Sequence, residues 1–307
     1  MHWISKKSSG PINALFAAVL TVGLFYMAQY VTLARLFLFF PFVTLLAAEG
    51  WGWTGLSMGG CVLVASLLVG PKQALLEALI VLPAACAMGL AIRKKLAPVH
   101  EILLTSLVLF ACALLQLYFV SRASGTPIFS EIESQVQSTI SSQWKEILNH
   151  MAEADQPSLE YQFSLAMDVL LHAIPGLLYV SGLLTALLTG LISHMALRGQ
   201  GVVPMALADF NLPRPLVLVL VGLPAALLLL FPDRLSNSSF FLVSLFLLVF
   251  NGLGFLDARF QKRMIHWLGR LILYALISFL VLPLPFFLFL GLADGLGQFR
   301  TRMRERG

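Results

Sequence analysis

The sequence predicts an all-α, polytopic integral membrane protein with eight or nine transmembrane helices and one extracytoplasmic amphipathic helical insert. Of the 307 residues, 59% are hydrophobic and 11% are charged, whereas a soluble domain carries about 25% charged residues. Most apolar residues fall in runs that suit a helix crossing the hydrocarbon core, which takes about 20 residues. One long stretch, 122–160, is too polar for a bilayer. These observations exclude an ordinary soluble fold.

Five apolar runs precede the polar stretch. The first, 12–30, follows a short polar segment that contains Lys6 and Lys7. No small-residue cleavage site closes this run, so we expect an uncleaved first span rather than a signal peptide. The next four spans are expected at 33–48, 54–69, 73–92 and 102–120.

The segment 122–160 is predicted to contain an amphipathic helix. It holds six acids and only two Lys or Arg residues, and its apolar residues recur at steps of three and four. Pro127 precedes the helix and Pro157 follows it, at positions where no helical N–H is needed. The apolar face either lies in the membrane interface or packs on the protein's own spans. We favour packing, because interfacial helices usually carry Lys and Arg on the polar face. The stripe consists of Ile128, Ile132, Val136, Ile140, Trp144, Ile147 and Met151.

Four further apolar runs lie at 163–197, 215–231, 239–256 and 271–292. The first of these is longer than one crossing requires. Either one steeply tilted helix runs through it, or Pro175-Gly176 divides it. The last run is interrupted by Leu282-Pro283-Leu284-Pro285. It forms either a ninth crossing or a re-entrant segment that leaves eight.

The basic residues between the runs predict the orientation. Arg93-Lys94-Lys95 is the densest basic cluster between two spans, and cytoplasmic loops collect Lys and Arg. This places the N-terminus with Lys6 and Lys7 in the cytoplasm and 122–160 on the outer side of the membrane. Nine crossings would put the four arginines of 300–307 outside, against the same trend, so the side of the C-terminus stays open.

The expected organisation has four parts. A five-helix transmembrane part comes first, the extracytoplasmic insert second and a three- or four-helix transmembrane part third, and a basic tail ends the chain. Their boundaries are 1–121, 122–160, 161–299 and 300–307.

Two ionisable residues lie within the long run. Asp168 and His172 are four apart, hence on one helical face, and charges at membrane depth are costly enough to need a reason. They form either a ligand or proton site, or a hydrogen-bonded pair near a wet helix end. Arg35, at the start of the second span, is the expected countercharge to Asp168. We take Arg35, Asp168 and His172 as ligand-binding candidates.

Small residues recur at helix-packing spacing, as in Ala14 with Ala18 and Gly55 with Gly59. Such pairs let helices approach closely, either inside the protein or against a partner. The insert offers a second docking surface through its apolar stripe. The partner-docking candidates are Ala14, Ala18, Ile132, Ile140 and Trp144.

No catalytic or metal-binding motif is found. The sequence has no HExxH, no Ser/His/Asp set and no phosphate-loop spacing, so we expect no enzyme activity, no cofactor and no metal. Cys61, Cys86 and Cys112 lie in apolar runs without paired spacing. The net charge of +5 comes from clusters between spans and does not indicate nucleic-acid binding. The expected partners are the lipid bilayer, membrane proteins and a small-molecule ligand.

Several short motifs occur together in this chain. Asn251-Gly252-Leu253-Gly254-Phe255 is followed by Gly291-Leu292-Ala293-Asp294, which leads to Phe299-Arg300. Pro175 and Asn211-Leu212-Pro213 lie before them. Over most of its length the chain thus resembles the YybS-like family of uncharacterised bacterial membrane proteins. This resemblance implies a helical fold in the inner (plasma) membrane of a bacterium rather than an activity.

The 41–71 region is also similar to the substrate-binding S subunits of energy-coupling-factor vitamin transporters. S subunits use an alanine pair on their first helix to dock a transport partner, and Ala14 and Ala18 occupy a similar position. S subunits have about six helices and no acidic insert, in which this chain differs. The resemblance implies a small-molecule binding or transport component. The alternative is a non-catalytic scaffold for an envelope or division complex.

Overall fold

A computed structural model describes residues 10–28, 30–149, 156–230, 237–263 and 284–305. Every regular element in these ranges is a helix. Sequence predictions that fall outside them concern the segment with Lys6 and Lys7, Met151 of the predicted stripe and the first part of the last apolar run, 271–283. The helices are α1 (Gly10–Ala28), η1 (Thr32–Phe37), α2 (Phe40–Glu49), α3 (Trp51–Val69), α4 (Pro71–Arg93), α5 (Pro98–Ser124), α6 (Ile128–Asn149), α7 (Gln156–Leu197), η2 (Arg198–Gln200), η3 (Leu207–Asp209), α8 (Arg214–Leu230), α9 (Asn237–Lys262), α11 (Leu284–Gly297) and α12 (Phe299–Glu305).

Six of the described helices are long and apolar enough to cross a membrane. Three further apolar helices, α2, α8 and α11, are shorter than such a span. The described part of the chain is thus that of a membrane protein with several apolar helices. The expected total of eight or nine crossings remains a prediction. The six helices cover Gly10–Ala28, Trp51–Val69, Pro71–Arg93, Pro98–Ser124, Tyr161–Gln200 and Ser238–Lys262.

The second expected span is divided. Residues 32–37 form the 3₁₀ helix η1, and α2 begins only at Phe40, with Pro41 in its first turn. Pro41 suits this place because its missing N–H is not needed there. The 10 residues of α2 reach about 15 Å, half of the hydrocarbon core. α2 by itself does not span it.

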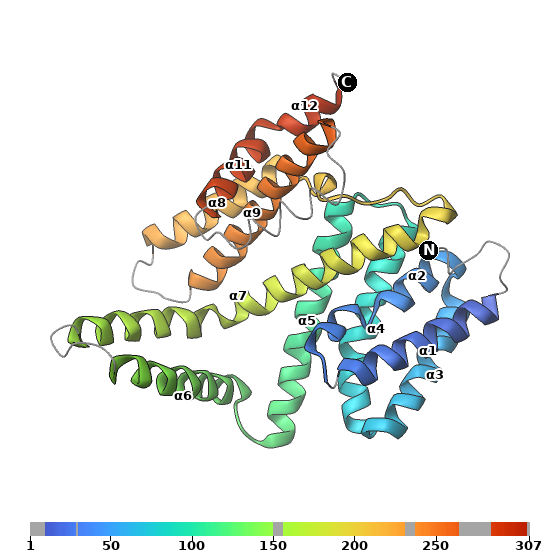
Figure 1. The fold of residues 1–307 in the computed structure, drawn as a ribbon, viewed down its shortest axis with the longest axis horizontal. Coiled ribbons are helices and arrows are strands. Elements are labelled where there is room, and N and C mark those ends of the chain that lie inside the picture. Colours follow the sequence, from blue (N-terminus) through green and yellow to red (C-terminus); the bar gives the residue numbers. More distant parts are fainter. Residues whose placement is uncertain (1–9, 29, 150–155, 231–236, 264–283, 306–307) are drawn as a thin grey trace.

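The long run after the insert forms one helix. Of the two alternatives at Pro175-Gly176, the structure shows the continuous one, because α7 has 42 residues with Pro175 inside. A helix of this length extends about 63 Å, twice the core of a bilayer. The first half of α7 projects from the rest of the protein, and α6 runs beside it (Figure 1).

The insert contains the expected helix. α6 begins directly after Pro127, and Ile132, Val136 and Ile140 are half-buried while most described side chains between them are exposed. The helix contacts α5 and α7. That this helix is an amphipathic insert on the extracytoplasmic side remains a prediction.

Two pairs of consecutive helices are joined by a single glycine. Gly50 joins α2 to α3 with φ at +84°, and Gly70 joins α3 to α4 with φ at +91°. Residues with a Cβ rarely adopt these angles. The two glycines therefore let consecutive helices fold back on one another.

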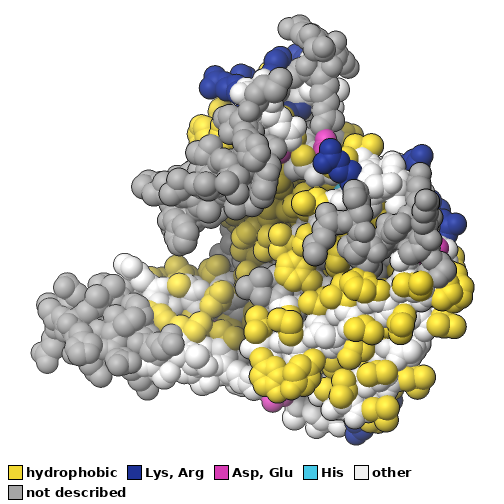
Figure 2. Space-filling model, turned by 45° about the vertical axis from the view of Figure 1, so that its right-hand side comes forward, with side chains coloured by type: hydrophobic (Ala, Val, Ile, Leu, Met, Phe, Trp, Pro, Cys, Tyr) yellow, Lys and Arg dark blue, Asp and Glu magenta, His cyan; other side chains and the backbone are white. Residues whose placement is uncertain are grey.

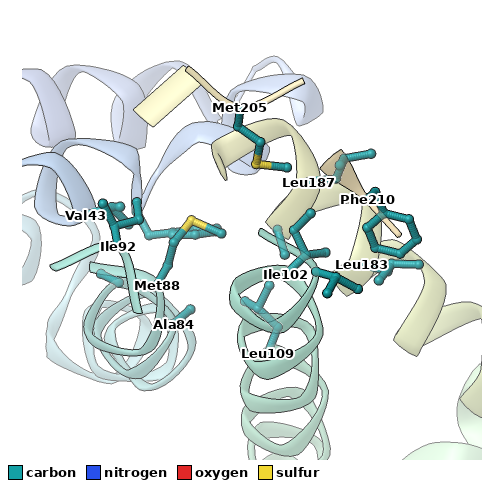
Figure 3. Close-up of a cluster of buried hydrophobic side chains, with 14 of the residues drawn as sticks. Val43, Ala84, Met88, Ile92, Ile102, Leu109, Leu183, Leu187, Met205 and Phe210 are labelled. Atoms are coloured by element: carbon teal, nitrogen blue, oxygen red, sulfur yellow. The ribbon is translucent and has the colours of Figure 1, made fainter. Parts of the chain in front are cut away.

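The main apolar core lies where α4, α5 and α7 meet. Figure 3 shows Met88 of α4 beside Val43 of α2, and Ile102 of α5 beside Leu183 and Leu187 of α7. Met205 and Phe210 join them from the segment between α7 and α8. This connection is thus packed into the core rather than lying loose on the surface.

A second group of helices, α8, α9, α11 and α12, lies on the other side of α7 (Figure 1). α9 and α11 cross with almost no space between their backbones. A Cβ on Gly252 would overlap the carbonyl of Phe287, and one on Gly291 would overlap the carbonyl of Leu248. Only glycine allows this approach.

The outer surface is strongly apolar. Hydrophobic side chains cover much of the face in Figure 2, with Lys and Arg mainly near its edges. Leu63 and Leu67 of α3 are 70% and 88% exposed. Exposed leucines in such density suit contact with lipid rather than water.

Candidate functional site: two cavities and a buried arginine

A largely apolar cavity of about 590 Å³ lies between α5, α7 and the start of α9. We name it the His172 cavity. Its polar side chains are Glu133, His172, Tyr179 and Ser239, and Phe110 and Phe240 supply aromatic surface. The remaining lining residues are Leu107, Leu171, Ile174, Pro175, Gly176 and Val243.

Pro175 shapes the wall of the His172 cavity. Proline has no N–H and disturbs the helical hydrogen bonds of the preceding turn. Next to it, the amide of Gly176 donates to Ser239 Oγ at 3.2 Å, and that hydroxyl donates to the carbonyl of His172 at 2.7 Å. A Cβ on Gly176 would lie 2.8 Å from the carbonyl oxygen of Ser239. α9 therefore closes against α7 at this turn.

Tyr179 is held in a defined orientation. Its hydroxyl lies 3.2 Å from Ser106 Oγ, and its ring packs edge-on against Phe110 with 5.7 Å between centroids. Both partners come from α5. A hydrogen-bonding group is thus positioned beside an otherwise apolar wall.

The structure places the three sequence-predicted ligand residues differently. His172 lines the cavity, and its Nδ1 lies 2.8 Å from the backbone carbonyl of Asp168 rather than from the carboxylate. The Asp168 side chain is exposed and is not part of the cavity lining. Arg35, in η1, is also exposed. Within the described ranges it forms no ion pair with Asp168, so the expected countercharge contact is not formed.

The docking candidates are partly used inside the protein. Ala14 is buried, and its carbonyl accepts a hydrogen bond from Ser57 Oγ at 2.9 Å, while Ala18 is half-buried. Ile132 and Ile140 are half-buried on α6. Trp144 belongs to the same helix, but its side chain lies outside the described part. Gly55 and Gly59 are exposed, with open space where a Cβ would point.

A second cavity of about 570 Å³ lies beside the first turns of α5 and the last turn of α7. We name it the Glu101 cavity. It is more polar, because Arg93, Lys95, Glu101, His194 and Asp209 all line it. The other lining residues are Ala47, Ala48, Ile92, Leu96, Pro98, Gln200, Gly201, Val202, Val203, Pro204 and Met205.

Glu101 and His194 form a buried pair in this cavity. The His194 Nε2 lies 2.8 Å from Glu101 Oε2, and the side chains are only a few per cent exposed. His194 Nδ1 contacts the carbonyl of Val203 at 2.8 Å. The pair therefore ties α5, α7 and the segment after α7 together. Sequence reasoning missed it because the two residues are 93 positions apart and Glu101 precedes the expected start of its span.

A third polar site is built around Arg300, which is 2% exposed. Its Nε donates to Asp294 Oδ2 at 2.6 Å, and its backbone amide donates to Asp294 Oδ1 at 3.0 Å. The two terminal nitrogens donate to the carbonyls of Ala208, Phe210 and Asn251 and to the side chain of Asn251. All five guanidinium N–H groups thus have acceptors.

Asn251 and Asp257 extend this Arg300 network. Asn251 Oδ1 accepts the amide of Leu212 at 3.1 Å, and its Nδ2 donates to the carbonyl of Gly291 at 2.8 Å. Asp257 accepts the amide of Ala208 at 3.0 Å. The network joins α9, α11 and α12 to the connection before α8.

The residues behind the family resemblance meet in this network. Asn251, Leu212, Gly291, Asp294 and Arg300 come from three separate stretches of sequence. The structure joins them through hydrogen bonds. Their spacing in the sequence is therefore explained by one packing arrangement.

No metal site is visible in the part of the chain that the structure describes, since no group of three or more His, Cys, Asp or Glu side chains could hold an ion. Cys61 and Cys112 are buried and Cys86 is half-buried.

One family match covers most of the chain. The family described as "Predicted membrane protein (DUF2232)" matches residues 14–295. No curated protein and no solved structure matches. The match supports neither the YybS-like name nor a likeness to transporter S subunits. Because it spans nearly all of the helices described above, the chain belongs to the family of predicted membrane proteins DUF2232.

Proposed function

We propose that the protein is a small-molecule binding or transport component of a bacterial inner membrane. The ligand lies in the His172 cavity and has an apolar body with at least one hydrogen-bonding group. The observation that carries this proposal is the cavity itself, at about 590 Å³. Ligand cavities typically measure about 300–1,000 Å³ and combine apolar walls with a few polar groups.

The polar side chains support a defined binding orientation. His172 and Tyr179 line the same cavity, and the hydroxyl of Tyr179 is already positioned by Ser106. A ligand can exchange hydrogen bonds with both side chains while its apolar part contacts Phe110 and Phe240. Asp168 and Arg35 lie outside the lining and remain candidates for a charged part of the ligand.

The test is extraction of the full-length protein, purified in mild detergent from its native membrane, followed by mass spectrometry of the organic extract. Leu107→Trp fills the cavity from α5, and Leu104→Trp is its control, since Leu104 is exposed on the same helix but does not line the cavity. We expect one compound with the wild type and Leu104→Trp, and its loss with Leu107→Trp. Equal amounts in all three samples would refute this cavity as the binding site.

The orientation is proposed with the N-terminus in the cytoplasm and α6 outside. The cluster Arg93-Lys94-Lys95 supports it through the preference of basic loops for the cytoplasm. Ser138 is exposed on α6, so Ser138→Cys can be labelled with an impermeant maleimide in intact spheroplasts. We expect Ser138→Cys to be labelled in intact spheroplasts. If it were labelled only after lysis, α6 would lie in the cytoplasm, and the proposed orientation would be wrong.

A scaffold for an envelope or division complex is the second candidate. The open faces of Gly55 and Gly59 favour it, since small residues let another helix approach. Gly55→Leu with Gly59→Leu, or Ile132, Ile140 and Trp144 to Ser, should then abolish capture of one membrane partner. Unchanged capture with both sets would exclude these surfaces.

A further inference from the structure

Glu101 and His194 are two ionisable side chains that face each other inside an apolar bundle. Glu101 is 2% exposed and His194 is 6% exposed. Intramembrane acids and histidines of this kind commonly belong to proton relays. The hydrogen-bond partners of His194 show how many protons the pair holds.

His194 has an acceptor at each ring nitrogen. The carbonyl of Val203 lies 2.8 Å from Nδ1 and can only accept, so Nδ1 carries a hydrogen. The Glu101 carboxylate lies 2.8 Å from Nε2. This contact needs a second hydrogen, either on Nε2 or on Oε2, because two lone pairs would otherwise face each other. The observed geometry therefore contains one proton shared between Nε2 and Oε2.

The pair can exchange this proton with solvent. Both side chains line the Glu101 cavity, whose rim includes the exposed residues Lys95, Gly201 and Val203. Among the described residues, no group is hydrogen-bonded to the other carboxylate oxygen, Oε1 of Glu101. Water in the cavity therefore has a place to bind next to the shared proton.

Other charges of the cavity act on the pair. Arg93 and Lys95 come from the end of α4 and the turn after it, and Asp209 comes from η3. The Asp209 carboxylate accepts the amide of Ala206 at 2.8 Å. Arg93 and Lys95 place positive charge on the wall of the cavity beside the pair, and Asp209 places negative charge there.

We propose that Glu101 and His194 form a proton-binding site that takes up one proton from the Glu101 cavity. With the proton bound, the pair holds α5 against α7 and fixes Val203. When the proton leaves, Nε2 and the carboxylate repel each other and this contact opens. Since α7 also carries His172, the opening gives a route by which a proton can drive movement of the solute. That last link rests on the proposed function, whereas the proton site does not.

The test is infrared difference spectroscopy of the full-length protein in lipid, between about pH 5 and about pH 8, the range in which histidine commonly titrates. Glu101→Gln keeps the contact, because the Gln amide donates to the neutral ring, but removes the shared proton. His100→Gln is the control, since His100 is the exposed neighbour of Glu101 and does not line the cavity. No solute is added, so failure here is independent of the proposed function.

We expect carboxyl and imidazole bands that change together with pH in the wild type and in His100→Gln, and their loss in Glu101→Gln. Identical difference spectra for the wild type and Glu101→Gln would overturn the proposal. A second measurement needs no variant: ¹⁵N solid-state spectra of histidine-labelled wild type should show one ring with both nitrogens hydrogen-bonded at low pH, changing state as pH rises. A pH-independent set of buried-histidine signals would equally overturn it.

Discussion

The Arg300 guanidinium donates to the Asp294 carboxylate at 2.6 Å, with both side chains almost completely buried. They lie six positions apart in two consecutive helices, α11 and α12. These helices meet at Gln298, where φ is +49°. The same guanidinium binds carbonyls of the connection between α7 and α8. One side chain thus fastens the last helices to the rest of the protein.

Replacing this arginine should destabilise the protein. Arg300→Met leaves Asp294 buried without its cation and several carbonyls without donors. Loss of one partner of a buried ion pair costs about 3–5 kcal/mol. The loss of stability is measured by thermal unfolding of the protein purified in detergent. Arg302→Met is the control, because Arg302 is exposed on the same helix. Equal unfolding temperatures for the two variants would contradict the Arg300 network.

The close crossing of α9 and α11 makes a second prediction. Gly252→Ala places a methyl group into the backbone of α11, and such overpacking costs about 1–3 kcal/mol. Gly222→Ala, in α8, meets open space and should leave stability unchanged or raise it slightly. Chemical or thermal unfolding of both variants gives the comparison. If Gly252→Ala were as stable as Gly222→Ala, the two helices would lie further apart than described.

Ser239→Ala tests the joint between α7 and α9. It removes the partner of the Gly176 amide and of the His172 carbonyl, at a cost of about 0.5–1.5 kcal/mol for each lost hydrogen bond. We also expect less compound to co-purify, since the same turn forms the cavity wall. Ser181→Ala is the matched control, because the Ser181 hydroxyl is exposed and donates a hydrogen bond within its own helix. A similar loss in both variants would assign the effect to serine removal in general.

Much of the fold could be predicted from the sequence because hydropathy acts locally. The apolar runs ending near Ile92, Val120 and Leu256 each became a long helix, and α6 formed after Pro127. Local pattern could not show that residues 32–37 form a separate 3₁₀ helix, since their composition also suits a span.

The polar sites required the tertiary structure. His172 was found because a histidine in an apolar run is conspicuous. Glu101 and His194 were not found, because they pair with each other across 93 positions of sequence. Arg300 looked like part of a basic tail, and only the folding of the 206–212 segment over it makes it a core residue.

The most direct test of the account is a cryo-electron microscopy map of the full-length protein in a native-lipid nanodisc. The proposed function predicts compact non-protein density between α5, α7 and α9, in contact with His172 and Tyr179, which disappears in Leu107→Trp. A His172 cavity that holds only lipid chains or solvent in the wild type would contradict the account.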